Sequence, residues 1–367
     1  MNFSRRVFLG SLAAFGAIPG FAADEKDGKD TTFSTDVRVI NVLATVRDKS
    51  GHIVKNLNQE DFILTEEGKQ QTIRYFARET DLPLTLGLLV DTSMSQRRVL
   101  GQEKTASFRF LDKVLRAEKD QTFIMHFDHE SELLQDLTSS RPLLQKALDE
   151  IELPADQRSG QRQGGQGQGG RSRGGVGFPG GGRRRGGRGG GAGQGGGGPQ
   201  SRGSRGGAGT TMYDAILLAS DEITRKQKGR KALILLTDGV DNGSKTFLND
   251  AIEAAQRADT LVYSILFADE QSYRNPFGGG RGGGGEHVDG RKVLQQISRE
   301  TGGSFYEVSK KLSIDDIYDQ LQEELRNQYS LGYSPEAKDA SGYKAIKLTT
   351  KRSGLIVQTR EGYYAGR

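Results

Sequence analysis

Three short polar segments carry the side chains most able to do chemistry in this chain. DTSMS places Asp91, Ser93 and Ser95 directly after an apolar run, GTTMYD contains Thr210, and TDG places Asp238 after a second apolar run. The set offers two carboxylates and three hydroxyls, without a histidine or cysteine. Oxygen ligands of this kind suit a hard divalent cation, and Mg²⁺ binds them octahedrally while it keeps some of its waters. The five residues therefore predict a site for Mg²⁺ or Mn²⁺.

The region around these segments predicts the elements that would bring them together. Continuous apolar runs at 84–91, 121–128, 231–238 and 261–268 are typical of strands covered on both faces, and helical patterns separate them. Strands that alternate with helices predict an α/β fold, a doubly wound and mostly parallel sheet with helices on both faces. Such sheets bind ligands at the carboxyl ends of their strands. The chain direction places all three polar segments at that edge.

Some neighbouring side chains carry expectations of their own. His126 and His129 flank a turn and are expected to be exposed, while Asp214 and Asp241 are expected to cap or support the site without ligating a metal. The first helix is expected to bury one stripe with a lysine along its edge, made of Leu100, Lys104, Phe108, Leu111 and Leu115.

Taken together, the three polar segments resemble the metal-ion-dependent adhesion site of the von Willebrand factor A domain family. DTSMS matches the D-x-S-x-S pattern of that family, Thr210 matches its threonine, and Asp238 matches its later aspartate. The resemblance implies that the hydroxyls of Ser93, Ser95 and Thr210 ligate the metal. It also implies that Asp91 and Asp238 act largely through bound water.

The resemblance spans about residues 82–327 without the two glycine-rich inserts, and it implies a metal-dependent module that binds a protein or other acidic ligand. A metal held mostly by neutral hydroxyls keeps much of its charge, so an acidic group of the partner would complete its coordination. Each motif alone is an ordinary turn or capping pattern, and the prediction depends on their ordered combination. A hydrolase using metal-activated water is the least favoured alternative, because the nearby bases are the two aspartates already engaged. We therefore expect no enzyme activity.

The segments on either side of this region predict short strands. Residues 33–80 and 328–367 contain alternating runs broken by Gly and Pro. Each flank has too few strands for a core of its own, so we expect both to pack together as one small antiparallel β unit, with the domain at 81–327 inserted between them. The flanks also resemble those of a bacterial, often exported, family of related proteins. The alternation in the first strand is centred on Val37, Val39, Asn41 and Leu43.

A glycine-rich insert interrupts the α/β region at residues 157–209, and a smaller one lies at 275–286. The larger insert holds 26 of the 52 glycines and ten arginines but no lysine or acid, so without it the formal net charge changes from +5 to −5. It resembles the RGG segments of RNA-binding proteins, which keeps RNA or another anionic polymer as an alternative, although a nucleic-acid partner is not expected. The other two interpretations are a disordered loop without a partner and electrostatic steering of acidic partners toward the metal.

The N-terminus predicts export. Residues 1–22 have a basic start, a short apolar stretch and small residues before the expected cleavage site, which is typical of a signal peptide. The adjacent Arg5 and Arg6 in SRRVFL favour the twin-arginine type over a general secretory signal. The chain has no cysteine, which excludes disulfides, thiol catalysis and cysteine-bound zinc. We expect a periplasmic or otherwise extracytoplasmic protein that is not an integral membrane protein after cleavage.

Overall fold

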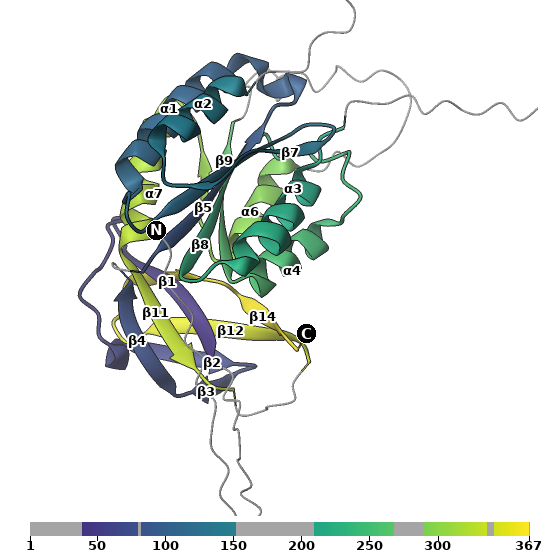
Figure 1. Ribbon diagram of the computed structural model, residues 1–367. Helices are drawn as coiled ribbons and strands as arrows, with labels where there is room; N and C mark the ends of the chain where they lie inside the picture. The colour runs from purple at the N-terminus through teal and green to yellow at the C-terminus, as the bar shows by residue number, and fades with distance from the viewer. Residues whose placement is uncertain (1–38, 80–81, 152–208, 268–288, 336–340, 367) are drawn as a thin grey trace, which may run out of the picture. The chain divides into compact units, whose positions relative to one another are not determined.

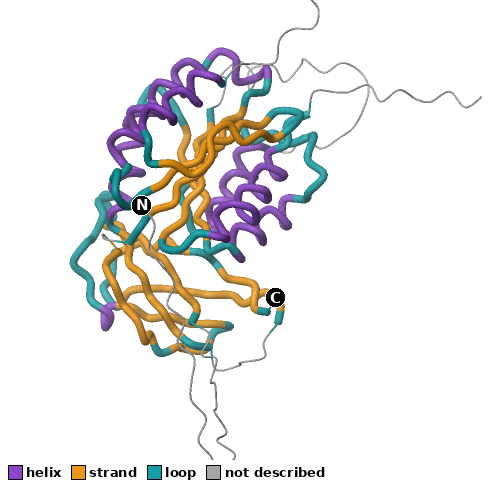
Figure 2. The backbone as a smooth tube through the Cα atoms, in the orientation of Figure 1, coloured by secondary structure: helices purple, strands orange, loops and turns teal. Residues whose placement is uncertain are grey.

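The computed structural model describes residues 39–79, 82–151, 209–267, 289–335 and 341–366 (Figure 1). These residues form a helix-flanked sheet and a separate group of antiparallel strands (Figure 2). Among them, no helix is both long and apolar enough to cross a membrane.

A six-stranded sheet forms the centre of the α/β region, and five of its strands run parallel. Only the edge strand β7 runs antiparallel, as the partner of β6. The predicted fold class, a mostly parallel doubly wound sheet, is confirmed. In order across the sheet, the strands are β10 (Phe305–Glu307), β9 (Thr260–Leu266), β8 (Arg230–Thr237), β5 (Leu84–Asp91), β6 (Gln121–Phe127) and β7 (Ser131–Thr138).

Helices cover both faces of this sheet (Figure 1). One face packs against α1 (Leu100–Val114), α2 (Arg141–Glu150) and α7 (Ile314–Arg326). The other packs against α3 (Met212–Leu218), α4 (Leu248–Arg257) and α6 (Gly290–Thr301). The described residues also contain short 3-10 and π turns, namely η1 (Gln59–Asp61), η2 (Met94–Arg98), η3 (Ala219–Ile223) and η4 (Thr224–Lys226).

The central strand β5 is buried along its whole length because both of its faces contribute to a core. Leu86, Leu88 and Val90 pack toward α1, whereas Leu89 packs toward α3. Gly87 also faces the second core, where a Cβ atom would lie 2.3 Å from the Phe123 ring. The sequence LTLGLLVD is therefore apolar without alternation, as expected for a strand covered on both sides.

The flanking strands form a β-sandwich, two four-stranded antiparallel sheets that enclose a third core. Three tyrosines (Tyr329, Tyr333 and Tyr363) and several aliphatic side chains fill the space between the sheets. One sheet has the order β13 (Leu355–Thr359), β1 (Ile40–Asp48), β11 (Gln328–Tyr333), β4 (Ile73–Glu79). The other has the order β14 (Gly362–Ala365), β12 (Gly342–Thr350), β2 (Phe62–Glu66), β3 (Lys69–Gln71).

Strands from the two ends of the chain are interleaved in both sheets. β1 lies between β11 and β13, and β2 pairs with β12. The alternating set on which the first strand was centred is not its buried face. Val39 is 43% exposed and Asn41 is also exposed. The buried set is Ile40, Val42, Ala44 and Val46. Leu43, on the opposite face, packs against the α/β core, so both faces of β1 carry apolar side chains and the pattern is ambiguous.

One buried carboxylate joins the sandwich to the α/β region. Glu324 of α7 is 1% exposed and forms an ion pair of 3.3 Å with Arg47 of β1. Its oxygens also accept hydrogen bonds from the hydroxyls of Ser304 and Tyr306 at 2.7 and 2.9 Å. A buried charge of this kind is stable because all of its partners are present.

Candidate functional site

Asp91 is the last residue of β5 and lies buried at the carboxyl edge of the sheet. One carboxylate oxygen accepts the backbone N–H of Ser93 at 2.9 Å, and the other accepts the hydroxyl of Thr237 at 2.6 Å. Thr237 ends the neighbouring strand β8, and its hydroxyl oxygen in turn accepts the N–H of Gly239 at 3.0 Å. Burial raises the pKa of Asp91 to about 6, although these hydrogen bonds oppose the shift.

The two serines of DTSMS form a hydroxyl pair directly after this aspartate. Ser93 Oγ and Ser95 Oγ lie 2.8 Å apart, and Ser95 is exposed. The turn is fixed by the bond from Ser93 N to Asp91 and by the 3-10 turn η2, in which Gln96 N donates to Ser93 O at 3.0 Å. The pair thus presents two hydroxyl oxygens beside a buried carboxylate.

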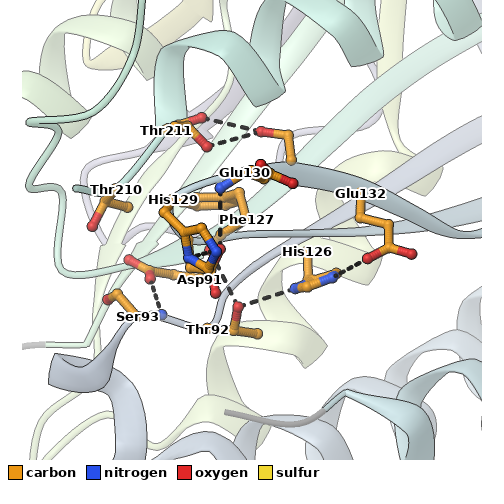
Figure 3. A network of polar contacts seen from close by, with 12 residues as sticks. Asp91, Thr92, Ser93, His126, Phe127, His129, Glu130, Glu132, Thr210 and Thr211 are labelled. Atoms are coloured by element: carbon orange, nitrogen blue, oxygen red, sulfur yellow. Dashed lines mark hydrogen bonds and ion pairs between the residues drawn. The ribbon is translucent and has the colours of Figure 1, made fainter. Parts of the chain in front are cut away.

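Thr210 is held at the same edge by the loop that contains Asn242 and Gly243. Its N–H donates to Asn242 Oδ1 at 2.7 Å, and its carbonyl accepts the N–H of Gly243 at 3.0 Å. Next to it, Gly209 packs so closely against Gly243 that a Cβ atom would lie 2.8 Å from that residue's Cα. Figure 3 shows the side chain of Thr210 on the same side of the network as Asp91.

Asp238 follows β8 and is partly exposed. One of its oxygens accepts the N–H of Val240 at 3.1 Å, and its charge contributes to the raised pKa of Asp91. In the part of the chain that the structure describes, no three His, Asp or Glu side chains are grouped as a metal cage. The edge combines two carboxylates with hydroxyls, which is the donor set predicted for the five residues.

His126 corrects one expectation, because only 18% of its side chain is exposed. Its Nδ1 lies 3.0 Å from Thr92 Oγ1 and its Nε2 lies 3.3 Å from a carboxylate oxygen of Glu132 (Figure 3). The arrangement has the order hydroxyl, imidazole, carboxylate that nucleophilic catalysis uses. Thr92 is 0% exposed, however, so a substrate could not reach its hydroxyl. The contact instead fixes the middle residue of Asp91-Thr92-Ser93. His129 is largely exposed beside Asp128.

Asp214 and Asp241 support the loops around Thr210. Asp241 accepts the N–H of Tyr213 at 3.0 Å and the hydroxyl of Ser244 at 2.6 Å. Asp214 accepts the backbone N–H groups of residues 245 and 246 at 3.0 and 2.9 Å. Both carboxylates therefore bind backbone, as expected of loop-capping residues.

Two buried polar residues near the site were missed by the sequence interpretation. Glu103 of α1 and Gln96 of η2 are 1% and 2% exposed. Lys104 lies along the edge of the buried stripe of α1, as expected, and donates to the carbonyls of Asp149 and Ile151 at 2.8 and 3.1 Å. The residues buried on α1 are Leu100, Glu103, Ala106, Ser107, Phe110, Leu111 and Val114. The helical spacing of these residues was the available signal for the burial of Glu103, because it places this glutamate on the apolar stripe.

Several predictions fall outside the described residues. They are the signal peptide at 1–22, the first residues of the N-terminal flank, the glycine-rich and arginine-rich insert at 157–209 except its last residue, and the smaller insert at 275–286.

Comparison with known protein sequences does not assign the chain to a family. No protein-family model matches the chain. Among curated proteins, it is 27% identical over 111 residues to an uncharacterized protein of Borreliella burgdorferi, a match that covers 29% of this chain. The chain spans only 33% of that relative's length.

Solved structures with a similar arrangement include members of the family that the polar segments resemble. A von Willebrand factor type A protein from Catenulispora acidiphila matches with a TM-score of 0.42 and 9% identity, over 90% of this chain and 75% of its own. BatB from Bacteroides thetaiotaomicron matches at 0.40 and 15%, over 66% and 97%. Proximal thread matrix protein 1 of the mussel byssus, with a zinc-occupied MIDAS motif, matches at 0.40 and 12%, over 71% and 50%. All three matches have TM-scores below 0.5 and identities below 25%, and they are similarities of backbone arrangement.

Proposed function

We propose that the chain is a metal-dependent binding module whose site lies at the carboxyl edge of the α/β sheet. Ser93, Ser95 and Thr210 would hold a divalent cation, Mg²⁺ or Mn²⁺, through their hydroxyls. Asp91 and Asp238 would act largely through bound water. The observation that carries the proposal is the buried carboxylate of Asp91, fixed by two hydrogen bonds directly beside the paired serine hydroxyls.

The residues present fit such an ion. Carboxylate and hydroxyl oxygens are hard donors of the kind that Mg²⁺ prefers, and the set leaves room for its waters. Asp91 is buried and accepts from two neutral donors, Ser93 N and the Thr237 hydroxyl, so its negative charge lacks a positive partner among the contacts of the site. A bound cation would supply that charge and offset the burial that raises the pKa of the group.

The partner in this proposal is a protein or other ligand that offers an acidic group. Three neutral hydroxyls and at most two carboxylates leave a divalent ion able to attract another anionic oxygen. Next to Thr210, a hollow borders the site, and Asn242 belongs both to the hollow and to the contact with Thr210. Phe247 lines this hollow and is 77% exposed, which gives a partner an aromatic surface near the metal.

We propose binding in preference to catalysis, and the signal-like sequence at 1–22 supports the proposal of an extracytoplasmic location. The described residues around the site include one hydroxyl–imidazole–carboxylate series, and its hydroxyl is buried. The remaining bases, Asp91 and Asp238, are those that the cation would engage.

Thermal melting with and without Mg²⁺ or Mn²⁺ tests the proposal. A ligand that binds only the folded state stabilises it by about 2.7 kcal/mol at a concentration of 100 Kd. We expect wild type to melt at a higher temperature in the metal, and Asp91→Ala to show no such increase. Asp120→Ala is the matched control, because Asp120 is 2% exposed and is bound by Arg116 just before β6, away from the carboxyl edge. A metal response retained by Asp91→Ala and lost by Asp120→Ala would contradict the assignment.

A further inference from the structure

Directly after DTSMS in the chain, two buried side chains carry acceptor oxygens that no described donor satisfies. Both carboxylate oxygens of Glu103 and the amide oxygen of Gln96 are buried and lack a hydrogen-bond partner in the described part of the chain. Buried polar atoms are nearly always paired, and an unpaired one typically costs about 1–3 kcal/mol, more for a charged group. Three such atoms on two neighbouring helical turns suggest that their donors lie outside the described residues, as a bound ligand would.

Backbone hydrogen bonds place Gln96 and Glu103 on the same side of the chain. Val99 N donates to Gln96 O at 3.0 Å, and Glu103 N donates to Val99 O at 2.9 Å. The two residues are thus separated by two successive helical turns and share one face. Gln96 N is also bonded to Ser93 O, so this face continues directly from the hydroxyl pair.

Electrostatics connects Glu103 to the same site. Burial raises the pKa of Glu103 well above its ordinary value, and the negative charge of Asp91 raises it further. A neutral, protonated Glu103 would offer one O–H donor and still leave acceptors unsatisfied around it. Coordinated water is a better complement, since each water on a divalent ion has two polarised O–H groups that need acceptors.

We propose that Glu103 and Gln96 accept hydrogen bonds from water molecules bound to the cation of the candidate site, and so position its hydration. The inference rests on the proposed metal site and extends it to two residues outside D-x-S-x-S, Thr210 and Asp238. Both are positioning residues: they act on the ion through its waters and not as direct ligands. It also accounts for a glutamate on the buried stripe of α1, where an apolar residue would otherwise pack.

Metal affinity of the full chain tests this assignment, measured by Mn²⁺ titration with the free ion followed by electron paramagnetic resonance. Glu103→Gln keeps the volume and removes the charge. We expect its affinity to fall about 10–100-fold, the usual effect of losing a group that orients a ligand of a metal. Its melting temperature without metal should stay equal to or above that of wild type, because a buried unpaired carboxylate has been removed.

Glu324→Gln is the matched control. Glu324 is buried to the same extent but has its partners in Arg47, Ser304 and Tyr306. This variant should lower the melting temperature and leave Mn²⁺ affinity within twofold of wild type. Gln96→Met removes the amide acceptor at similar volume and should also weaken Mn²⁺ binding, which keeps the test valid if Glu103→Gln does not fold.

The outcomes separate the two proposals. If wild type binds Mn²⁺ and both variants bind it equally well, the role of Glu103 and Gln96 is wrong and the metal site stands. If wild type itself does not bind, the proposed function fails and this inference fails with it.

Discussion

The sandwich and the carboxyl edge of the α/β sheet both bury acidic side chains, but they treat them differently. In the sandwich, Glu66 is 8% exposed and accepts the hydroxyls of Tyr333 and Tyr363. At the sheet edge, Asp91 accepts from two neutral groups, and the carboxylate of Glu103 lacks any partner in the described part of the chain. A buried acid surrounded by donors stabilises a core, whereas one left short of donors marks a place where a ligand is expected.

The largest expected effect would test whether the two regions respond independently. Tyr329 is 1% exposed, and its ring lies against Phe62 and Phe76 in the sandwich. Tyr329→Ala should lower the free energy of unfolding by about 3–5 kcal/mol, because it leaves a cavity and unpairs the N–H of Leu57, which donates to the tyrosine hydroxyl at 3.0 Å. Urea denaturation measures the loss. The increase in melting temperature caused by Mg²⁺ should persist, and its disappearance would show that the site depends on the sandwich.

The second prediction uses pH to examine the sheet edge alone. With the pKa of Asp91 raised to about 6, the metal-free folded state holds a proton between about pH 4 and 6 that the unfolded state releases. The contribution of protonated Asp91 to the free energy of unfolding therefore falls as pH rises through this window. Metal binding has the opposite dependence, because a cation competes with that proton.

We therefore expect Mg²⁺ to raise the melting temperature at pH 7.5 and to have little effect at pH 5. Buffers of equal ionic strength keep screening constant. An equal metal response at both values would mean that no carboxylate of raised pKa takes part in binding.

Much of this comparison could be anticipated from the sequence, and the missed parts have a common cause. Continuous apolar runs and chain direction were sufficient to predict the sheet and to place Asp91, Thr210 and Asp238 at its carboxyl edge. Which face of β1 is buried was harder to predict, because Val39 and Leu43 place apolar side chains on the other face as well. Glu103 was missed because the long aliphatic part of its neighbour Lys104 fits a helix stripe equally well. The local spacing places Glu103 on the apolar stripe, but tertiary contacts decide whether Glu103 or Lys104 is the residue buried there.

The third prediction sharpens the contrast between satisfied and unsatisfied acids. The pKa of Tyr333 is raised by burial and by its hydrogen bond to Glu66, which keeps its hydroxyl protonated as a donor. Tyr333→Phe removes that donor and should lower the free energy of unfolding by about 1.5–3 kcal/mol, as expected for a hydrogen bond to a charged group. Chemical denaturation measures the change, and Mg²⁺ affinity should equal that of wild type. An unchanged free energy of unfolding in Tyr333→Phe would show that the tyrosine hydroxyls do not stabilise Glu66.

The smallest effect is expected for an acid whose side chain is half exposed. Arg109 of α1 forms an ion pair of 2.9 Å with Asp315 of α7, and the side chains are 54% and 50% exposed. Water already solvates both charges, so holding them together gains little and salt screens the attraction. A double-mutant cycle with Arg109→Ala and Asp315→Ala should give a coupling energy of about 0.2–1 kcal/mol at low salt. The coupling should approach zero in 0.5 M salt. A coupling as large as the loss in Tyr333→Phe would mean that charge pairing, and not the burial of a carboxylate with its donors, sets the energetic difference between these regions.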